Sequence, residues 1–391
     1  MKILICSDTY KYQTNGVVTV LSTLVSGLRQ LGHEVRVLAP SYNGKSFKNG
    51  DDCFLCSVPA LYYPKERICI KHKDPLIDEL ISWNPDIINS HTEGMIGRIA
   101  IRIAKETNTP LVMNNHTDFA KYIFGRFYDI PPVRAGGKVF GKINYPHADA
   151  IIVPSEKSRG LVWMQPYNDI VSVIPSGIRT EKFQRPVSSE EKAELMRKYN
   201  IEDNGLTVVT VTRVSKEKNL MEILQYFASL LKVVPEAQLV IVGDGPDKKR
   251  LEKYCEQSGI SDRVHFTGGV EPDEVYRYYA LGDVFVCAST FEVQGMTYYE
   301  AMACGLPQVC RKDDCLINVI ENGENGFIYE NEQEFTDAVS KILLDKELRE
   351  KMSRKALEKI KMFNDKRFVE RVVELYEDVL KQAQEEESSP E

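Results

Sequence analysis

Two short segments of the second half carry the side chains best suited to chemistry. Arg213 and Lys218 lie five residues apart in TRVSKEKN, directly after the apolar run LTVVTV. A guanidinium binds a phosphate as a fork and an ammonium binds it as a point charge, so this pair could hold a diphosphate. Taken alone, the segment is better explained as a solvated turn formed by Lys216 and Lys218.

The other segment is FEVQGMTYYEAMACGLP, which follows the apolar strand-like run DVFVCAST. Gly295 precedes a helical pattern, so the backbone N–H groups of Met296 and Thr297 are unpaired at a positive helix end that suits a phosphate. Glu292 and Glu300 flank this point, and carboxylates suit the hydroxyls of a sugar. A capped helix start with two solvated acids is the alternative.

Three residues of the first half stand where strands end or helices begin. Gly16 lies between the first strand and the first helix, where a backbone N–H could contact a phosphate. His116 ends the strand-like run PLVMNNHT and His91 ends DIINSH. A hydrogen-bonded structural role is the alternative for either histidine.

Several motifs are missing from the chain, and each absence argues against one class of enzyme or binding site. No GxGxxG follows the first strand, and GDGPDK breaks that pattern at its last position, which disfavours a dinucleotide-dependent dehydrogenase. No Asp-x-Asp occurs, which disfavours a nucleotide sugar held through a metal. Cys53 and Cys56 form a single CxxC without a second pair, which gives little support to a zinc site.

The elements around these segments alternate between strand and helix in both halves. Val- and Ile-rich strands joined by helices indicate parallel sheets covered on both faces. We expect an α/β protein with two doubly wound Rossmann-like domains facing each other across a cleft, in which ligands bind beyond the carboxyl ends of the strands. The expected parts are an acceptor domain over 1–183, a donor domain over 184–365, a helix over 366–383 that packs back across the domains, and a disordered acidic tail over 384–391.

The composition is that of an ordinary globular protein. The 391 residues are 43% hydrophobic and 27% charged, which excludes a fibrous or disordered chain. No apolar run approaches the roughly 20 residues that span a bilayer, and the N-terminus turns polar too early for a signal peptide, so we expect a cytoplasmic protein. The net charge is +5 over 1–183 and −12 over 184–391, which fits either a polyanionic partner of the first half or a drift of surface charge.

Taken together, these segments resemble the retaining GT-B glycosyltransferases of family 4. The spacing of Glu292 and Glu300, a Glu-x7-Glu, is the most specific element. The matching segments follow one another along nearly the whole chain: DTYKYQTNGV, NNHTDF, VIPSGI, TRVSKEKN, IVGDGP, HFTGGV, FEVQGMTYYEAMACGLP and ENGENGF.

The resemblance implies a role for each of these site residues. Gly16 would face the diphosphate of the donor, and His116 would face the donor sugar near its reacting carbon. Arg213 and Lys218 would bind the diphosphate, and Glu292 would bind sugar hydroxyls. The other donor-binding residues would be Gln294, Gly295, Met296 and Thr297 through the helix start, and Glu300 on the ribose. No metal or organic cofactor is expected.

The acceptor is expected to be a lipid. The Gln-Gly-x-Thr-Tyr form at 294–298 resembles the subgroup that glucosylates diacylglycerol in Gram-positive bacteria. The segment 117–143 mixes aromatic and basic side chains, which suits an anionic membrane interface, although a helix packed on the domain with its cations in water is the alternative. Its expected membrane or acceptor contacts are Phe119, Tyr122, Phe124, Arg126 and Phe127. No motif supports a nucleic-acid partner.

The expected activity is therefore retaining transfer of a hexose, with glucose from UDP-glucose as the favoured donor, to a lipid hydroxyl such as that of diacylglycerol. It would occur on the inner face of the cell membrane without a required metal. Three alternatives stay open: the same chemistry on a soluble or polysaccharide acceptor, a nucleotide-sugar epimerase or phosphorylase on the same fold, and a protein that senses nucleotide sugars without turnover.

Overall fold

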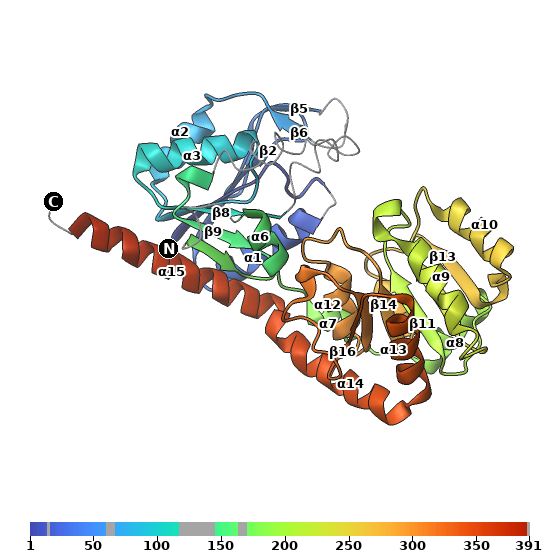
Figure 1. Cartoon of the computed structure of the whole chain (residues 1–391). Coiled ribbons are helices and arrows are strands. Elements are labelled where there is room, and N and C mark those ends of the chain that lie inside the picture. Colours follow the sequence, from blue (N-terminus) through green and yellow to red (C-terminus); the bar gives the residue numbers. More distant parts are fainter. Residues whose placement is uncertain (14–15, 60–66, 117–144, 163–169, 389–391) are drawn as a thin grey trace, which may run out of the picture. The chain divides into compact units, whose positions relative to one another are not determined.

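The computed structural model describes residues 1–13, 16–59, 67–116, 145–162 and 170–388, and the chain divides into two compact units (Figure 1). The first unit consists of Met1–Gly177 together with Asp365–Glu391, and the second is Ile178–Asn364. Each contains a mainly parallel sheet with helices on both faces, which confirms the predicted α/β class and the two Rossmann-like domains.

In the part of the first unit that the structure describes, the main sheet has the order β10-β9-β8-β7-β1-β2-β4-β3, and β3 alone is antiparallel to its neighbour. Its strands are β1 Lys2–Cys6, β2 Glu34–Pro40, β3 Phe47–Asn49, β4 Asp52–Leu55, β7 Ile87–Ser90, β8 Leu111–Asn114, β9 Ala150–Val153 and β10 Val171–Val173, with a separate hairpin of β5 Ser57–Pro59 and β6 Arg67–Cys69. The helices are α1 Gly16–Gln30, α2 Pro75–Trp83, α3 Met95–Thr107, α6 Glu156–Val162 and α15 Asp365–Ser388.

Side chains of β1 alternate between two apolar layers. Ile3 and Ile5 pack with α1 and α15, whereas Leu4 and Cys6 pack with α2 and α3. This alternation is the period-two pattern of a strand buried on both faces.

The sheet of the second unit, as far as the structure describes it, is parallel throughout, in the order β13-β12-β11-β14-β15-β16. Its strands are β11 Thr207–Val211, β12 Gln238–Val242, β13 Val264–Gly268, β14 Val284–Cys287, β15 Gln308–Arg311 and β16 Gly326–Tyr329. Its α-helices are α7 Thr180–Phe183, α8 Ser189–Lys198, α9 Leu220–Leu230, α10 Lys248–Ser258, α11 Val275–Tyr279, α12 Met296–Ala303, α13 Glu332–Leu344 and α14 Lys346–Lys359. Two buried apolar layers cover its two faces.

The last helix, α15, groups with the first unit, whereas the sequence analysis expected a helix that packs back across the domains. Its buried side chains join the core layer that contains α1, and Val369 lies so close to Gly27 that a Cβ on Gly27 would stand 2.5 Å from it. The OH of Tyr376 accepts a hydrogen bond from Asn89, whose Oδ1 accepts one from Asn114. These two buried bonds tie α15 to β7 and β8.

The boundaries also differ from those expected. The second unit begins at Ile178 rather than residue 184, because α7 packs within it and the Phe183 ring meets the Tyr279 ring edge-on at 6.2 Å. Residues 384–388, expected to be a disordered tail, continue α15, since the Gln and Glu side chains there favour a helix. The sequence interpretation also missed β3, β4, β5, β6 and β16.

Candidate functional site

The predicted donor residues of the second unit meet at one edge of its sheet. Its strand order places β11 beside β14, and successive strands extend outward on either side, which makes this the topological switch point where open α/β sheets bind ligands. The loop after β11 carries Arg213 and Lys218, and the loop after β14 carries Glu292 and Gly295. The four positions therefore lie beyond the carboxyl ends of two adjacent strands.

Lys218 and Glu292 form an ion pair, with Nζ 2.5 Å from Oε1. Their side chains are 21% and 17% exposed, so the pair is half-buried and is screened less by solvent than a surface pair. The Arg213 side chain is exposed, and its guanidinium forms no hydrogen bond or ion pair within the described part of the chain. The guanidinium of Arg213 is therefore available to an incoming anion, whereas the ammonium of Lys218 is paired with the carboxylate of Glu292.

The start of α12 contains a glycine that no other residue can replace easily. Gly295 has φ 73° and caps α12 without a side-chain hydrogen bond to the first turn. A Cβ at this position would lie 2.3 Å from the ring of Tyr298 and 3.2 Å from Cγ of Glu292. Met296 and Thr297 follow as the first helical residues and are half-buried, whereas Gln294 is buried.

Glu300 lies one turn into α12 and is held by a buried tyrosine. The OH of Tyr279 donates to its Oε2 at 2.8 Å, and Tyr279 is fully buried. Burial raises the pKa of Glu300, whereas the Tyr279 hydrogen bond and the nearby charge of Lys182 oppose that rise. This tyrosine orients the carboxylate and helps to keep it ionised. The sequence interpretation missed it because Tyr279 lies 21 residues away from Glu300.

Replacing Tyr279 with Phe is therefore expected to raise the pKa of Glu300 and to weaken donor binding at low pH. Without the hydroxyl, the carboxylate is protonated at a higher pH, so the acid limb of kcat/KM for the donor moves upward by about one pH unit. A pH series of kcat/KM measures the shift. Tyr278→Phe is the control, since that hydroxyl contacts Tyr199. An unchanged acid limb in Tyr279→Phe would contradict the role.

The glycines of the GDGP segment have a packing role. A Cβ on Gly243 would stand 1.9 Å from the carbonyl oxygen of Thr212, and one on Gly245 would stand 2.2 Å from that of Val214. Backbone hydrogen bonds join the same loops, with the N–H of Val214 donating to Asp244 at 3.0 Å. The loop after β12 thus supports the loop that carries Arg213.

In the first unit, the structure brings together the two histidines that end β7 and β8. Nδ1 of His91 lies 2.7 Å from Nε2 of His116, and the rings are nearly parallel with 5.0 Å between their centroids. Burial lowers the pKa of His116 to about 4 and that of His91 well below its usual value, so both are neutral at pH 7. Gly16 is the first residue of α1 and is exposed.

Two carboxyl groups beside these histidines escaped the sequence interpretation. Asp8 follows β1, and its Oδ1 accepts a hydrogen bond from the N–H of Ile96 at 3.0 Å. Glu93 accepts one from the OH of Tyr145 at 3.1 Å, and burial raises the pKa of Glu93 to about 8. No motif marks these residues, because the contacts arise only when β1, β7 and β8 lie side by side.

The Glu93 carboxyl predicts a pH dependence of stability. Between the unfolded pKa of about 4.3 and the folded pKa of about 8, the folded state holds a proton that the unfolded state lacks. The unfolding free energy of the first unit should therefore fall with rising pH in this window, by at most about 1.4 kcal/mol per pH unit. Urea unfolding of wild type and Glu93→Gln measures it, since glutamine imitates the protonated acid and should flatten the slope. Exposed Glu106 provides the control, Glu106→Gln, and an identical slope in Glu93→Gln and wild type would contradict the assignment.

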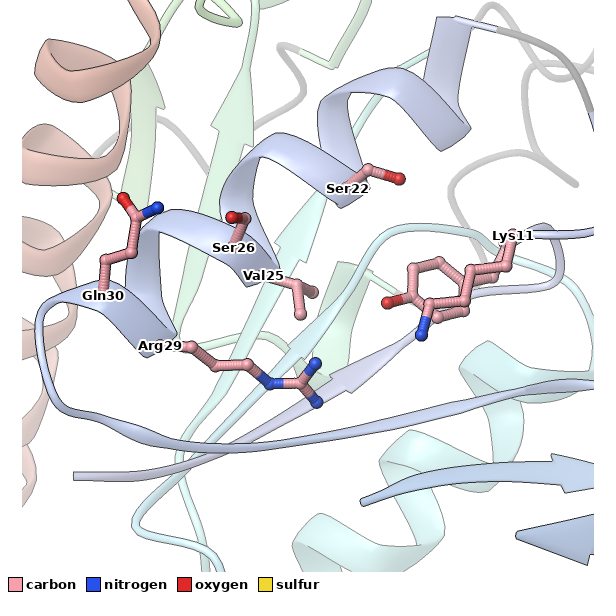
Figure 2. Close-up of a pocket in the computed structure, with 7 residues that line it drawn as sticks. Lys11, Ser22, Val25, Ser26, Arg29 and Gln30 are labelled. Carbon is pink, nitrogen blue, oxygen red and sulfur yellow. The ribbon is translucent and has the colours of Figure 1, made fainter. Parts of the chain in front are cut away.

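A pocket in the first unit lies away from these residues, between α1 and the loop after β1 (Figure 2). Its volume is about 430 Å³, the side chains of Lys11 and Arg29 extend toward each other in it, and Ser22 and Ser26 are among the residues that line it. Both cations already pair with the buried carboxylate of Asp52. We therefore do not assign this pocket to the donor.

The expected membrane or acceptor residues, Phe119, Tyr122, Phe124, Arg126 and Phe127, lie outside the described residues. Among the helices that the structure describes, none combines the length and apolar character needed to cross a bilayer. Within the same residues, no three His, Cys, Asp or Glu side chains are grouped so as to hold a metal ion.

Comparisons with known proteins show the family of the chain. The family models described as "Glycosyltransferase Family 4" and "Glycosyl transferases group 1" match residues 14–182 and 191–359. An "Alpha-monoglucosyldiacylglycerol synthase" of Acholeplasma laidlawii is 30% identical over 91% of this chain and 92% of its own, and the protein of that name from Streptococcus pneumoniae is 31% identical over 88% and 78%. The crystal structure of Anabaena HepE with UDP is 18% identical, with a TM-score of 0.75 over 97% of this chain and 100% of HepE, and thus shares the fold. The chain belongs to the GT-B glycosyltransferases of family 4.

Proposed function

We propose that this glycosyltransferase moves glucose from UDP-glucose to the hydroxyl of diacylglycerol, with retention at the anomeric carbon and without a metal. The observation that carries the proposal is the cluster of Arg213, Lys218, Glu292 and the start of α12 at one switch point. The names of the two bacterial relatives support the sugar and the acceptor.

The proposed role of the donor site is to stabilise negative charge on the leaving diphosphate. A leaving nucleoside diphosphate gains negative charge as the bond to the sugar breaks, and preorganised donors at that point are usually the largest catalytic contribution. The exposed guanidinium of Arg213 and the N–H groups at the start of α12 are free to meet this charge. Lys218 would join them when the sugar hydroxyls take its place beside Glu292.

We propose retention because the relatives' names print an alpha linkage, the configuration that glucose already has in UDP-glucose. Since our assignment places no carboxylate as a covalent nucleophile, retention requires attack on the face that the leaving group occupies. We propose that the acceptor oxygen attacks C1 on the face from which the diphosphate departs. The C1–O bond to the diphosphate breaks as the bond to the acceptor forms, and the departing phosphate oxygen takes the proton of the acceptor hydroxyl. The products are an α-glucoside and protonated UDP, in agreement with the "alpha" in the names of the relatives.

The acceptor would be reached at a membrane surface. The mixture of aromatic and basic residues in 117–143 and the basic balance of 1–183 suit attraction to anionic lipid, at about 1 kcal/mol per cation near the surface. We therefore propose a peripheral enzyme on the inner face of the cell membrane. A soluble or polysaccharide acceptor is the second candidate, since the same donor site would serve it.

Product formation from UDP-glucose tests the proposal, with anionic vesicles that contain diacylglycerol, with the same vesicles lacking it, and with neutral vesicles. We expect an α-glucolipid only when diacylglycerol is present, faster on anionic vesicles, and unaffected by EDTA. Sedimentation with the vesicles measures binding separately. Release of UDP without glycolipid would overturn the lipid acceptor and leave the donor site standing. Activity only with GDP-glucose or ADP-glucose would overturn the assignment of the base.

A further inference from the structure

The contact between His91 and His116 is unusually constrained for two imidazoles. Nδ1 of His91 and Nε2 of His116 are 2.7 Å apart, and the rings lie 12° from parallel. Two nitrogens at this distance must share one proton, because two lone pairs or two N–H groups would repel each other. If one ring donates this proton, the nitrogen of the other ring must be unprotonated and accept it.

The backbone and loop around His91 are firmly held. Its N–H donates to the carbonyl of Cys6 in β1 at 2.8 Å. Thr92, the next residue, donates from Oγ1 to Asp8 at 2.6 Å and accepts from the Asp8 N–H at 2.8 Å. A Cβ on Gly94 would lie 2.5 Å from the Asp8 carboxylate, so the loop fits closely around this buried acid. The backbone of His91 is thus held in place, so its ring can orient the ring of His116.

The other nitrogen of His91 decides which ring donates. Nε2 of His91 is buried and has no hydrogen-bond partner among the residues the structure describes. If His116 donated, the remaining proton of His91 would stand on this nitrogen as a buried, unpaired N–H. If His91 donates, the nitrogen keeps only a lone pair, and orphaned acceptors are tolerated better than orphaned donors. The arrangement with His91 as the donor is therefore favoured.

We propose that His91 is a positioning residue that holds neutral His116 as its Nδ1–H tautomer, so that His116 presents an N–H donor rather than a lone pair to its ligand. This inference rests on the proposed function and on the role that the family resemblance implies for His116, which would face the donor sugar. A fixed N–H can donate to a sugar hydroxyl or ring oxygen and cannot act as a base. Its partner is thus a hydrogen-bond acceptor on the transferred sugar.

The tautomer can be measured without turnover. In ¹⁵N NMR of the full-length protein labelled at histidine, with His116 assigned by comparison with His116→Gln, we expect a protonated Nδ1 and an unprotonated, hydrogen-bonded Nε2. His91→Phe retains an aromatic ring and removes the donor, so the His116 signals should become a mixture of tautomers. His91→Asn places an amide N–H near the former Nδ1 and should restore the wild-type pattern. A wild-type His116 with its proton on Nε2 would overturn the proposal.

Kinetics with UDP-glucose give an independent readout. We expect His91→Phe to lower kcat about tenfold with a smaller change in KM, because an unfixed tautomer reduces the productive fraction of bound complexes, and His91→Asn to recover most of that loss. His33→Asn, which alters a half-buried imidazole elsewhere in the same unit, should have no effect. Equal kcat losses in His91→Phe and His91→Asn would contradict positioning through the proton.

The two proposals fail in different ways. If the NMR pattern holds but the wild type transfers no glucose from UDP-glucose, the proposed function falls and the tautomer assignment stands. If glucose is transferred and the His116 tautomer does not depend on His91, the positioning role falls and the function stands. Thermal melting of each variant separates both results from misfolding.

Discussion

Replacing Arg213 with alanine is expected to lower kcat by about 10²–10³ and to change KM for the donor much less. The guanidinium is exposed at the switch point and makes no ion pair within the described residues, so it is available to the leaving diphosphate. The negative charge on the diphosphate is larger in the transition state, when the bond to the sugar is breaking, than in bound UDP-glucose. Steady-state kinetics with varied UDP-glucose measures the two parameters separately.

Two further variants make this prediction specific. Arg213→Lys keeps the charge but loses the fork of parallel N–H groups, so it should recover only part of the loss. Arg354→Ala removes another exposed guanidinium that lacks an ion pair among the described residues, from α14 of the same unit, and should retain wild-type kinetics. A rise in KM with unchanged kcat in Arg213→Ala would show that Arg213 binds the ground state and the transition state equally.

Replacing Gly295 with alanine is expected to abolish most of the donor affinity, with KM raised about tenfold or more. The backbone has φ 73°, which costs an alanine about 1–2 kcal/mol. The new Cβ would also stand 2.3 Å from the Tyr298 ring, so α12 and the Glu292 loop must separate. The start of α12 and the Glu292 carboxylate would then lose their alignment. Isothermal calorimetry with UDP measures the affinity.

Gly259→Ala serves as the control that separates the backbone cost of a positive φ from the steric clash at Gly295. Gly259 has φ 68° at the end of α10, and nothing lies within 4 Å of a Cβ placed there. This variant should lower the melting temperature through the backbone cost alone and leave UDP binding intact. If Gly295→Ala bound UDP as well as Gly259→Ala does, the close fit around α12 would have no part in donor recognition.

The strands and helices with strong periodicity could be predicted from the sequence, and weaker elements could not. β11, TVVTV, and β14, VFVC, are short runs rich in β-branched and aromatic residues, which favours buried strands over helices. β16, Gly326–Tyr329, is four residues long and begins with a glycine that is needed because a Cβ there would stand 2.3 Å from the carbonyl oxygen of Gln308. That requirement comes from the neighbouring strand and leaves no local periodic signal.

In the candidate site, too, features within one loop and helix could be predicted from the sequence, whereas contacts between residues far apart in the sequence could not. Gly295 and the Glu292–Glu300 spacing were visible because they lie within one loop and helix. The pairing of Lys218 with Glu292 joins residues 74 positions apart, and that of His91 with His116 depends on β7 lying next to β8. These contacts change the chemistry, since they neutralise one predicted phosphate ligand and fix the proton of another group. Only the register of the sheets reveals them.

The route of the chain through the two units also bears on its synthesis. Ile178 and Asn364 form a parallel bridge, so the chain enters and leaves the second unit at one place, and that unit is complete in sequence once Asn364 has been made. The first unit at that moment still lacks Phe368, Val372 and Tyr376, which fill its core. During synthesis the sequence of the second unit is therefore complete while the core of the first unit still has an apolar face uncovered. A chain truncated after Asn364 should hold a protease-resistant second unit and a first unit that a chaperone still recognises.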